Sequence, residues 1–165
     1  MDFSNLDRNR VILGALGGGL LLLSLLLLPW YSLSHATELR NQQGAWICGE
    51  GEFECTGFQT FPIMRWLLLA AAFAPLILAW ILVRGHKLSW APGEVTMVVG
   101  FAAITLIGYN GIIDRPAPDN GTEFGIGLSY GYWLALLAAI AIAATGFLRS
   151  LESGGRKERK APGTV

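Results

Sequence analysis

Four long apolar runs dominate this chain of 165 residues and constrain its fold more than any other feature. They cover residues 11–31, 62–83, 90–113 and 124–148. A helix rises about 1.5 Å per residue and the hydrocarbon core of a bilayer is about 30 Å thick, so about 20 apolar residues cross it. Buried strands run only about 4–8 residues. We therefore predict an all-α membrane protein whose single domain is an antiparallel bundle of four transmembrane helices.

The centres of these runs carry no charge. Asp, Glu, Lys and Arg are missing from Val11–Tyr31, Trp66–Val83, Val95–Ile113 and Phe124–Leu148. A helix on the surface of a soluble protein would show a polar face, and these runs show almost none. Charges inside a membrane usually mark ion or proton pathways, so their absence argues against an ion-coupled transporter. The first run exceeds the apolar part of a signal peptide, so we expect it to remain as a span.

The basic residues are distributed unevenly around the four runs. Nine lie on the side of the termini: Arg8, Arg10, Arg84, Lys87, Arg149, Arg156, Lys157, Arg159 and Lys160. Three lie on the other side: Arg40, Arg65 and Arg115. Because Lys and Arg are enriched in cytoplasmic segments, we predict a plasma (cytoplasmic) membrane protein with both termini in the cytoplasm. Loop 32–61 is then outside, and the charged tail 152–165 is predicted to be a disordered cytoplasmic segment.

Both cysteines of the chain, Cys48 and Cys55, lie in the outer loop. The extracellular compartment is oxidising, and the short spacing suits a local disulfide, which we favour over two free thiols. Short strand-like segments at 45–48 and 53–56 flank a turn rich in Gly and Glu. This pattern predicts a small extracellular β-hairpin between the first two spans, held by its own disulfide.

Side chains that carry chemistry are few and isolated. Glu50, Glu52 and Glu54 offer carboxylates to a cation, but they match no known ligand spacing and we interpret them as a solvated acidic face. His35 and His86 have no partner at metal-ligand or catalytic-triad spacing. We find no nucleophile with a matching base, so we predict no enzyme, no cofactor and no metal site. Zero net charge gives no field that would attract nucleic acid.

Small residues recur every four positions in the last run. They are Gly127, Gly131, Ala135, Ala139 and Ala143. On one helix they form a continuous stripe, and small side chains let helix backbones approach closely in lipid. The stripe serves either packing inside the bundle, which we favour, or assembly with a second chain.

Tyr109 and Asn110 are polar residues near the outer end of the third run. They are candidates for lining a small polar pocket. With Pro75 of the second run, they mark the place where we expect a cleft among the helices. The alternative, which we favour, is that they form hydrogen bonds to a neighbouring helix.

The whole chain resembles uncharacterised small four-span membrane proteins of bacteria. The segments that carry this resemblance are Leu28–Tyr31, Phe58–Phe61 and Leu128–Gly131. It implies a fold but no activity.

The first half is similar in layout to claudins. Trp30 follows the first span, Gly44-Ala45-Trp46 precedes Cys48 and Cys55, and Arg65 opens the second span. This resemblance implies a disulfide-linked extracellular sheet on a four-helix bundle, and a shared fold does not by itself imply a shared function.

The leading hypothesis for function is a structural or accessory membrane subunit without catalysis. It would act through helix packing and through outer aromatic residues, namely Trp46, Phe53 and Phe58. The expected partners are membrane lipids and either further copies of the chain or a larger membrane complex. The alternative is a binder or carrier of lipids or small apolar molecules in a cleft within the bundle.

Overall fold

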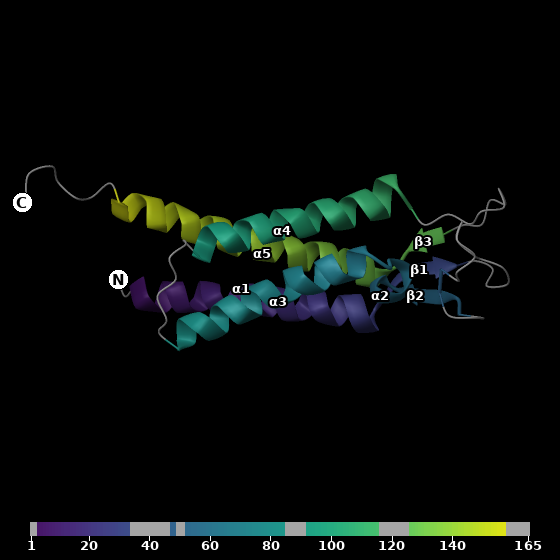
Figure 1. Cartoon of the computed structure of the whole chain (residues 1–165), viewed down its shortest axis with the longest axis horizontal. Coiled ribbons are helices and arrows are strands. Elements are labelled where there is room, and N and C mark those ends of the chain that lie inside the picture. Colours follow the sequence, from purple (N-terminus) through teal and green to yellow (C-terminus); the bar gives the residue numbers. More distant parts are fainter. Residues whose placement is uncertain (1–2, 34–46, 49–51, 85–91, 116–125, 158–165) are drawn as a thin grey trace, which may run out of the picture.

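The computed structural model describes residues 3–33, 47–48, 52–84, 92–115 and 126–157. Within these ranges, long helices run side by side with a small sheet at one end, which we call the sheet end (Figure 1). The long helices are α1 (Phe3–Leu27), α3 (Met64–Val83), α4 (Pro92–Gly108) and α5 (Tyr130–Lys157). The shorter elements are α2 (Gly57–Thr60), the π-helical turn η1 (Tyr109–Ile113), β1 (Pro29–Leu33), β2 (Glu54–Thr56) and β3 (Ile126–Leu128).

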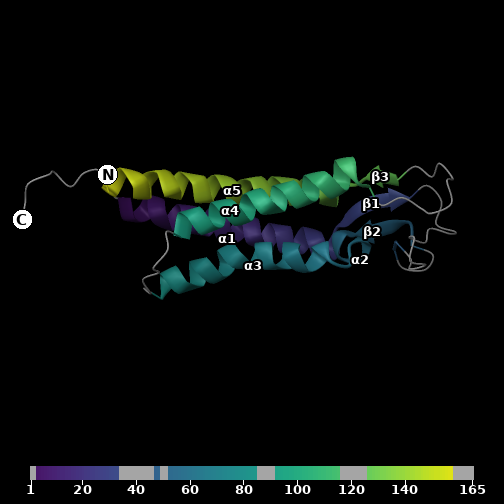
Figure 2. The same ribbon diagram turned by 45° about the horizontal axis from the view of Figure 1, so that its top comes forward.

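Each long helix contains a segment that is long and apolar enough to cross a membrane. These segments are Arg8–Leu27, Met64–Val83, Gly93–Ile113, where α4 continues into η1, and Tyr130–Leu151. Successive long helices run in opposite directions, so α1 begins and α5 ends at the end opposite the sheet (Figures 1 and 2). The prediction of four such helices in antiparallel order is confirmed.

Small residues position the helices against one another. α5 packs along both α1 and α4, and α1 also packs along α3. Gly100 of α4 faces the backbone of Ala143 in α5, and Gly18 of α1 faces Ala72 and Pro75 of α3. A Cβ atom at either glycine would overlap these neighbours. Close approach of the helix backbones at these crossings therefore depends on glycine.

The first helix ends earlier than predicted. α1 stops at Leu27, and residues 29–31 of the predicted span belong to strand β1. Proline has no amide hydrogen to donate and its ring collides with the preceding helical turn, so Pro29 ends the helix. Trp30 and Tyr31 then adopt the extended backbone that aromatic residues favour.

The predicted hairpin is replaced by a three-stranded antiparallel sheet in the order β2-β1-β3. In the centre, Tyr31 of β1 pairs with Cys55 on one side and with Leu128 on the other. Of the predicted first strand, residues 45–46 lie outside the described residues, and Ile47 and Cys48 are not in a strand. An isolated hairpin is only marginally stable, whereas a third strand and a helical support stabilise a sheet.

The fourth run also differs from the prediction. Strand β3 occupies residues 126–128 of this run, and α5 begins only at Tyr130. At the other end α5 continues to Lys157, so residues 152–157 of the predicted disordered tail are helical. Extending an existing helix adds one hydrogen bond for each residue ordered, which outweighs the two glycines in this last part of α5. Residues 158–165 lie outside the described residues.

Candidate functional site

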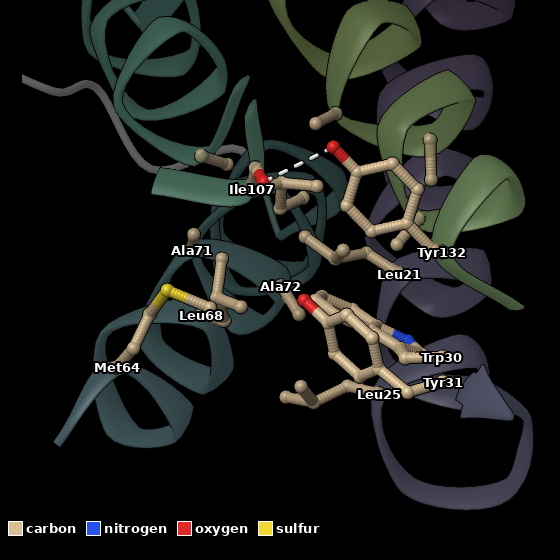
Figure 3. Packing of buried hydrophobic residues seen from close by; sticks show 14 of the residues in the cluster. Leu21, Leu25, Trp30, Tyr31, Met64, Leu68, Ala71, Ala72, Ile107 and Tyr132 are labelled. Carbon is tan, nitrogen blue, oxygen red and sulfur yellow. Dashed lines mark hydrogen bonds between the residues drawn. The ribbon is translucent and has the colours of Figure 1, made fainter. Parts of the chain in front are cut away.

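An aromatic cluster fills the sheet end of the bundle. Its members are Trp30, Tyr31, Phe61 and Tyr132. The Trp30 ring stands edge-on to Phe61 and Tyr132, with ring centroids 6.4 and 6.0 Å apart, and Tyr31 meets Phe61 at 5.9 Å. Such geometry is favourable beyond the apolar area that it buries. Figure 3 shows Trp30, Tyr31 and Tyr132, which are fully buried, among the core leucines.

The polar atoms of this cluster bond to helix backbones. The Ser24 hydroxyl donates to the Gly131 carbonyl at 2.6 Å, and Trp30 Nε1 donates to the carbonyl and the hydroxyl of Ser24, both at 3.1 Å. The Tyr132 hydroxyl donates to the Ile107 carbonyl at 3.2 Å (Figure 3). Sequence reasoning missed Ser24, although it is the single hydroxyl residue of the run 11–28. These bonds offset the penalty of burying polar groups.

The π-helical turn η1 is held by residues from two other elements. The Tyr31 hydroxyl of β1 donates to the Asn110 carbonyl at 3.2 Å, and the ring of Tyr132 lies against Gly111 with no room for a Cβ atom between them. A π-helical turn departs from the regular helical hydrogen-bond ladder, and such turns often sit at functional sites. The Tyr31 hydroxyl is protonated at neutral pH even at the ordinary pKa of tyrosine, and burial raises its pKa further.

The residues of the predicted polar pocket do not line the groove that lies between α3 and α4. Tyr109 is half exposed, and Asn110 donates its side-chain amide to the Leu106 carbonyl of its own helix at 2.9 Å. Pro75 instead packs against Gly18 of α1. Asn110 and Pro75 therefore make separate contacts within the bundle, and a cleft that they share with Tyr109 stays a prediction.

A groove runs between α3 and α4 and has a volume of about 670 Å³. Its lining is mostly alanine: Ala70, Ala71 and Ala74 from α3, and Ala102 and Ala103 from α4. The polar side chain in the lining is Thr105, whose hydroxyl donates to the Phe101 carbonyl of its own helix at 2.9 Å. The groove therefore offers an apolar, shape-based contact. We call it the α3–α4 groove.

The predicted stripe of small residues lies inside the bundle. Ala135, Ala139 and Ala143 of α5 are buried, and Gly131 lies against the Pro29 carbonyl. Gly127 is not part of the helix, because it lies in β3 beside Ser32. The four residues on α5 are covered by the chain's own helices and strands.

The sulfur atoms of Cys48 and Cys55 lie at bonding distance, with Cα atoms 5.1 Å apart, as predicted for a disulfide. Cys55 belongs to β2 and is fully buried. The bond therefore joins the segment around Cys48 to the edge of the sheet.

The outer aromatic and acidic residues lie in different surroundings. Phe53 is exposed and Phe58 is half buried, whereas Trp46 and Glu50 lie outside the described residues. Glu52 accepts a hydrogen bond from the Gln59 side chain at 3.2 Å. Among the described residues, no group of three or more His, Cys, Asp or Glu side chains is placed to hold a metal ion.

Comparisons with known proteins identify no relative of this chain. No family model matches the chain, and no curated protein or solved structure shows significant similarity to it. The resemblances to claudins and to small bacterial four-span proteins remain predictions.

Proposed function

We propose that this protein is a non-catalytic accessory subunit of the plasma membrane. Its four apolar helices cross the bilayer, with the sheet end outside and both termini in the cytoplasm. The charge distribution along the sequence supports this orientation: nine basic residues lie in the terminal segments and in the link after the second apolar run, and three lie in the segments predicted to be outside. Cytoplasmic segments are enriched in Lys and Arg.

The observation that carries the accessory role is the α3–α4 groove. The stripe on α5 is covered within the chain, whereas Ala70 and Ala102 of the groove are exposed and Ala74 is half-buried. Small side chains with four-residue spacing, such as Ala70 and Ala74, suit the close approach of another helix in lipid. In this proposal the groove receives a transmembrane helix of a partner, which is either a second copy or another membrane protein.

Filling the groove tests this role. Ala102→Leu places a large side chain in the α3–α4 groove, and Ala141→Leu makes the same change at an exposed position of α5 away from it. We expect the wild type and Ala141→Leu to migrate well above monomer mass in mild detergent, and Ala102→Leu to migrate as a monomer. A wild-type chain that is strictly monomeric, with no co-purifying protein, would contradict the proposal.

The second candidate function is binding or carrying a lipid in the same groove. Its volume of about 670 Å³ and its apolar lining favour an acyl chain as the occupant. In this case native mass spectrometry of the wild type shows a monomer with retained lipid, and Ala102→Leu loses the lipid without a change in oligomeric state. This outcome separates the carrier from the accessory subunit.

A further inference from the structure

Arg65 lies in the first turn of α3 at the sheet end, in an aromatic setting. Its guanidinium carbon is 4.9 Å from the centroid of the Phe58 ring and 5.5 Å from that of Trp66. The two rings meet edge-on, with centroids 6.0 Å apart. Phe58 comes from the short helix α2, so side chains from both α2 and α3 surround the Arg65 guanidinium. Aromatic faces attract a guanidinium and hold its plane in place.

The charge of Arg65 is not neutralised by the described part of the chain. Among the described residues, its buried Nε atom has no hydrogen-bond partner, and no carboxylate forms an ion pair with its guanidinium. The residue as a whole is only partly buried, so its outer nitrogens remain the donors that an external group can reach. A partly desolvated guanidinium without an anion is a strong donor for a charge-assisted hydrogen bond.

The surface around Arg65 is apolar. Trp66 is 59% exposed and Ile63 is 78% exposed. Tryptophan is enriched at the level of the lipid headgroups, with its apolar body toward the acyl chains. If the helices cross a bilayer as proposed above, Arg65 therefore lies at the depth of the phosphate groups.

We propose that Arg65, held between Phe58 and Trp66, binds the phosphodiester of a bilayer phospholipid at the sheet end. The guanidinium supplies paired N–H donors to the phosphate oxygens, and Trp66 and Ile63 contact the upper part of the acyl chains. This inference rests on the proposed membrane placement but not on the α3–α4 groove or on any protein partner.

The test uses the full chain in detergent, titrated with phosphatidylglycerol and followed by native mass spectrometry. Arg65→Gln is compared with Arg115→Gln, which removes an equal charge at the same end of the bundle from an exposed residue whose Nε donates to the Gly111 carbonyl. We expect Arg65→Gln to weaken lipid binding about fivefold to tenfold and Arg115→Gln to leave it unchanged. An equal loss of lipid affinity in both variants, or no loss in either, would contradict a phospholipid site at Arg65.

Two further measurements keep the proposal falsifiable. Phe58→Leu retains the charge and removes one ring, so it is expected to weaken binding about threefold, by loss of the cation–π contact. Unchanged lipid binding in Phe58→Leu would show that the Phe58 ring does not help Arg65 to bind the phosphate. If Arg65→Gln fails to fold, the lipid affinity of Phe58→Leu is the measurement that tests the proposal. Inorganic phosphate in excess over the lipid is expected not to displace it. Displacement would assign the site to free phosphate and overturn the lipid as ligand.

Discussion

At the scale of single residues, the glycines show where the bundle has no spare room. Gly131, at the start of α5, lies directly against the Pro29 carbonyl, and its own carbonyl accepts from Ser24. Gly19 in α1 has nothing within 4 Å of the position that a Cβ atom would take. The sequence alone does not distinguish the two glycines, because each lies near other small residues in an apolar run.

The matched pair Gly131→Ala and Gly19→Ala tests this difference. We expect Gly131→Ala to lower the free energy of unfolding by about 1–3 kcal/mol, because its methyl group overpacks a filled site. Gly19→Ala is expected to be neutral or to stabilise by up to about 1 kcal/mol, because alanine favours the helix. Unfolding of the purified chain in detergent, followed by circular dichroism, measures both. Similar changes in the free energy of unfolding for the two variants would contradict the tight packing at Gly131.

At the scale of elements, β1 connects the sheet to the helices. It pairs with β2 and β3, and it supplies Trp30 and Tyr31 to the aromatic cluster. Two segments that are far apart in the chain are thereby joined to the end of α1. The disulfide from Cys48 to Cys55 adds a covalent link at the β2 edge.

The double variant Cys48→Ser and Cys55→Ser tests that link. The closed loop is short, so the loop-entropy model gives a loss of only about 2.5 kcal/mol in the free energy of unfolding. The helix signal in circular dichroism should be unchanged, because the long helices pack mostly against one another and α1 makes only minor contact with β2. Adding a reductant should destabilise the wild type by the same amount and leave the double variant unaffected. A wild type that does not respond to reductant would contradict a structural role of the disulfide.

At the scale of the whole molecule, the alternating helices place the start of α1 and the end of α5 on one side and the sheet on the other (Figure 2). Asp114 follows η1 at the sheet end, and Arg84 follows α3 at the opposite end, and both are exposed. In the proposed orientation they lie on opposite sides of the membrane.

Labelling of single cysteines tests the orientation. A membrane-impermeant maleimide added to intact cells should label Asp114→Cys, and it should label Arg84→Cys only after the membrane is made permeable. The native cysteines should contribute no background while they are bonded to each other. Labelling of Arg84→Cys in intact cells would reverse the proposed topology, and release of the purified chain into buffer without amphiphile would refute the membrane placement itself.

Several features of this protein follow from local sequence alone. Run length and apolar composition are properties of neighbouring residues, so the number, order and approximate bounds of the long helices could be predicted. The pairing of Cys48 with Cys55 could be predicted for the same reason, since the two residues are close along the chain.

Other features required the tertiary structure, because they depend on which distant segments meet. Gly127 and Gly131 fit one four-residue pattern, yet Gly127 belongs to strand β3 and Gly131 belongs to helix α5. The partner of β2 is a strand more than twenty residues earlier, which no local pattern predicts. The α3–α4 groove depends on how the helices pack: α4 packs mainly along α5 and less closely along α3, which leaves two alanine-rich helix faces incompletely covered.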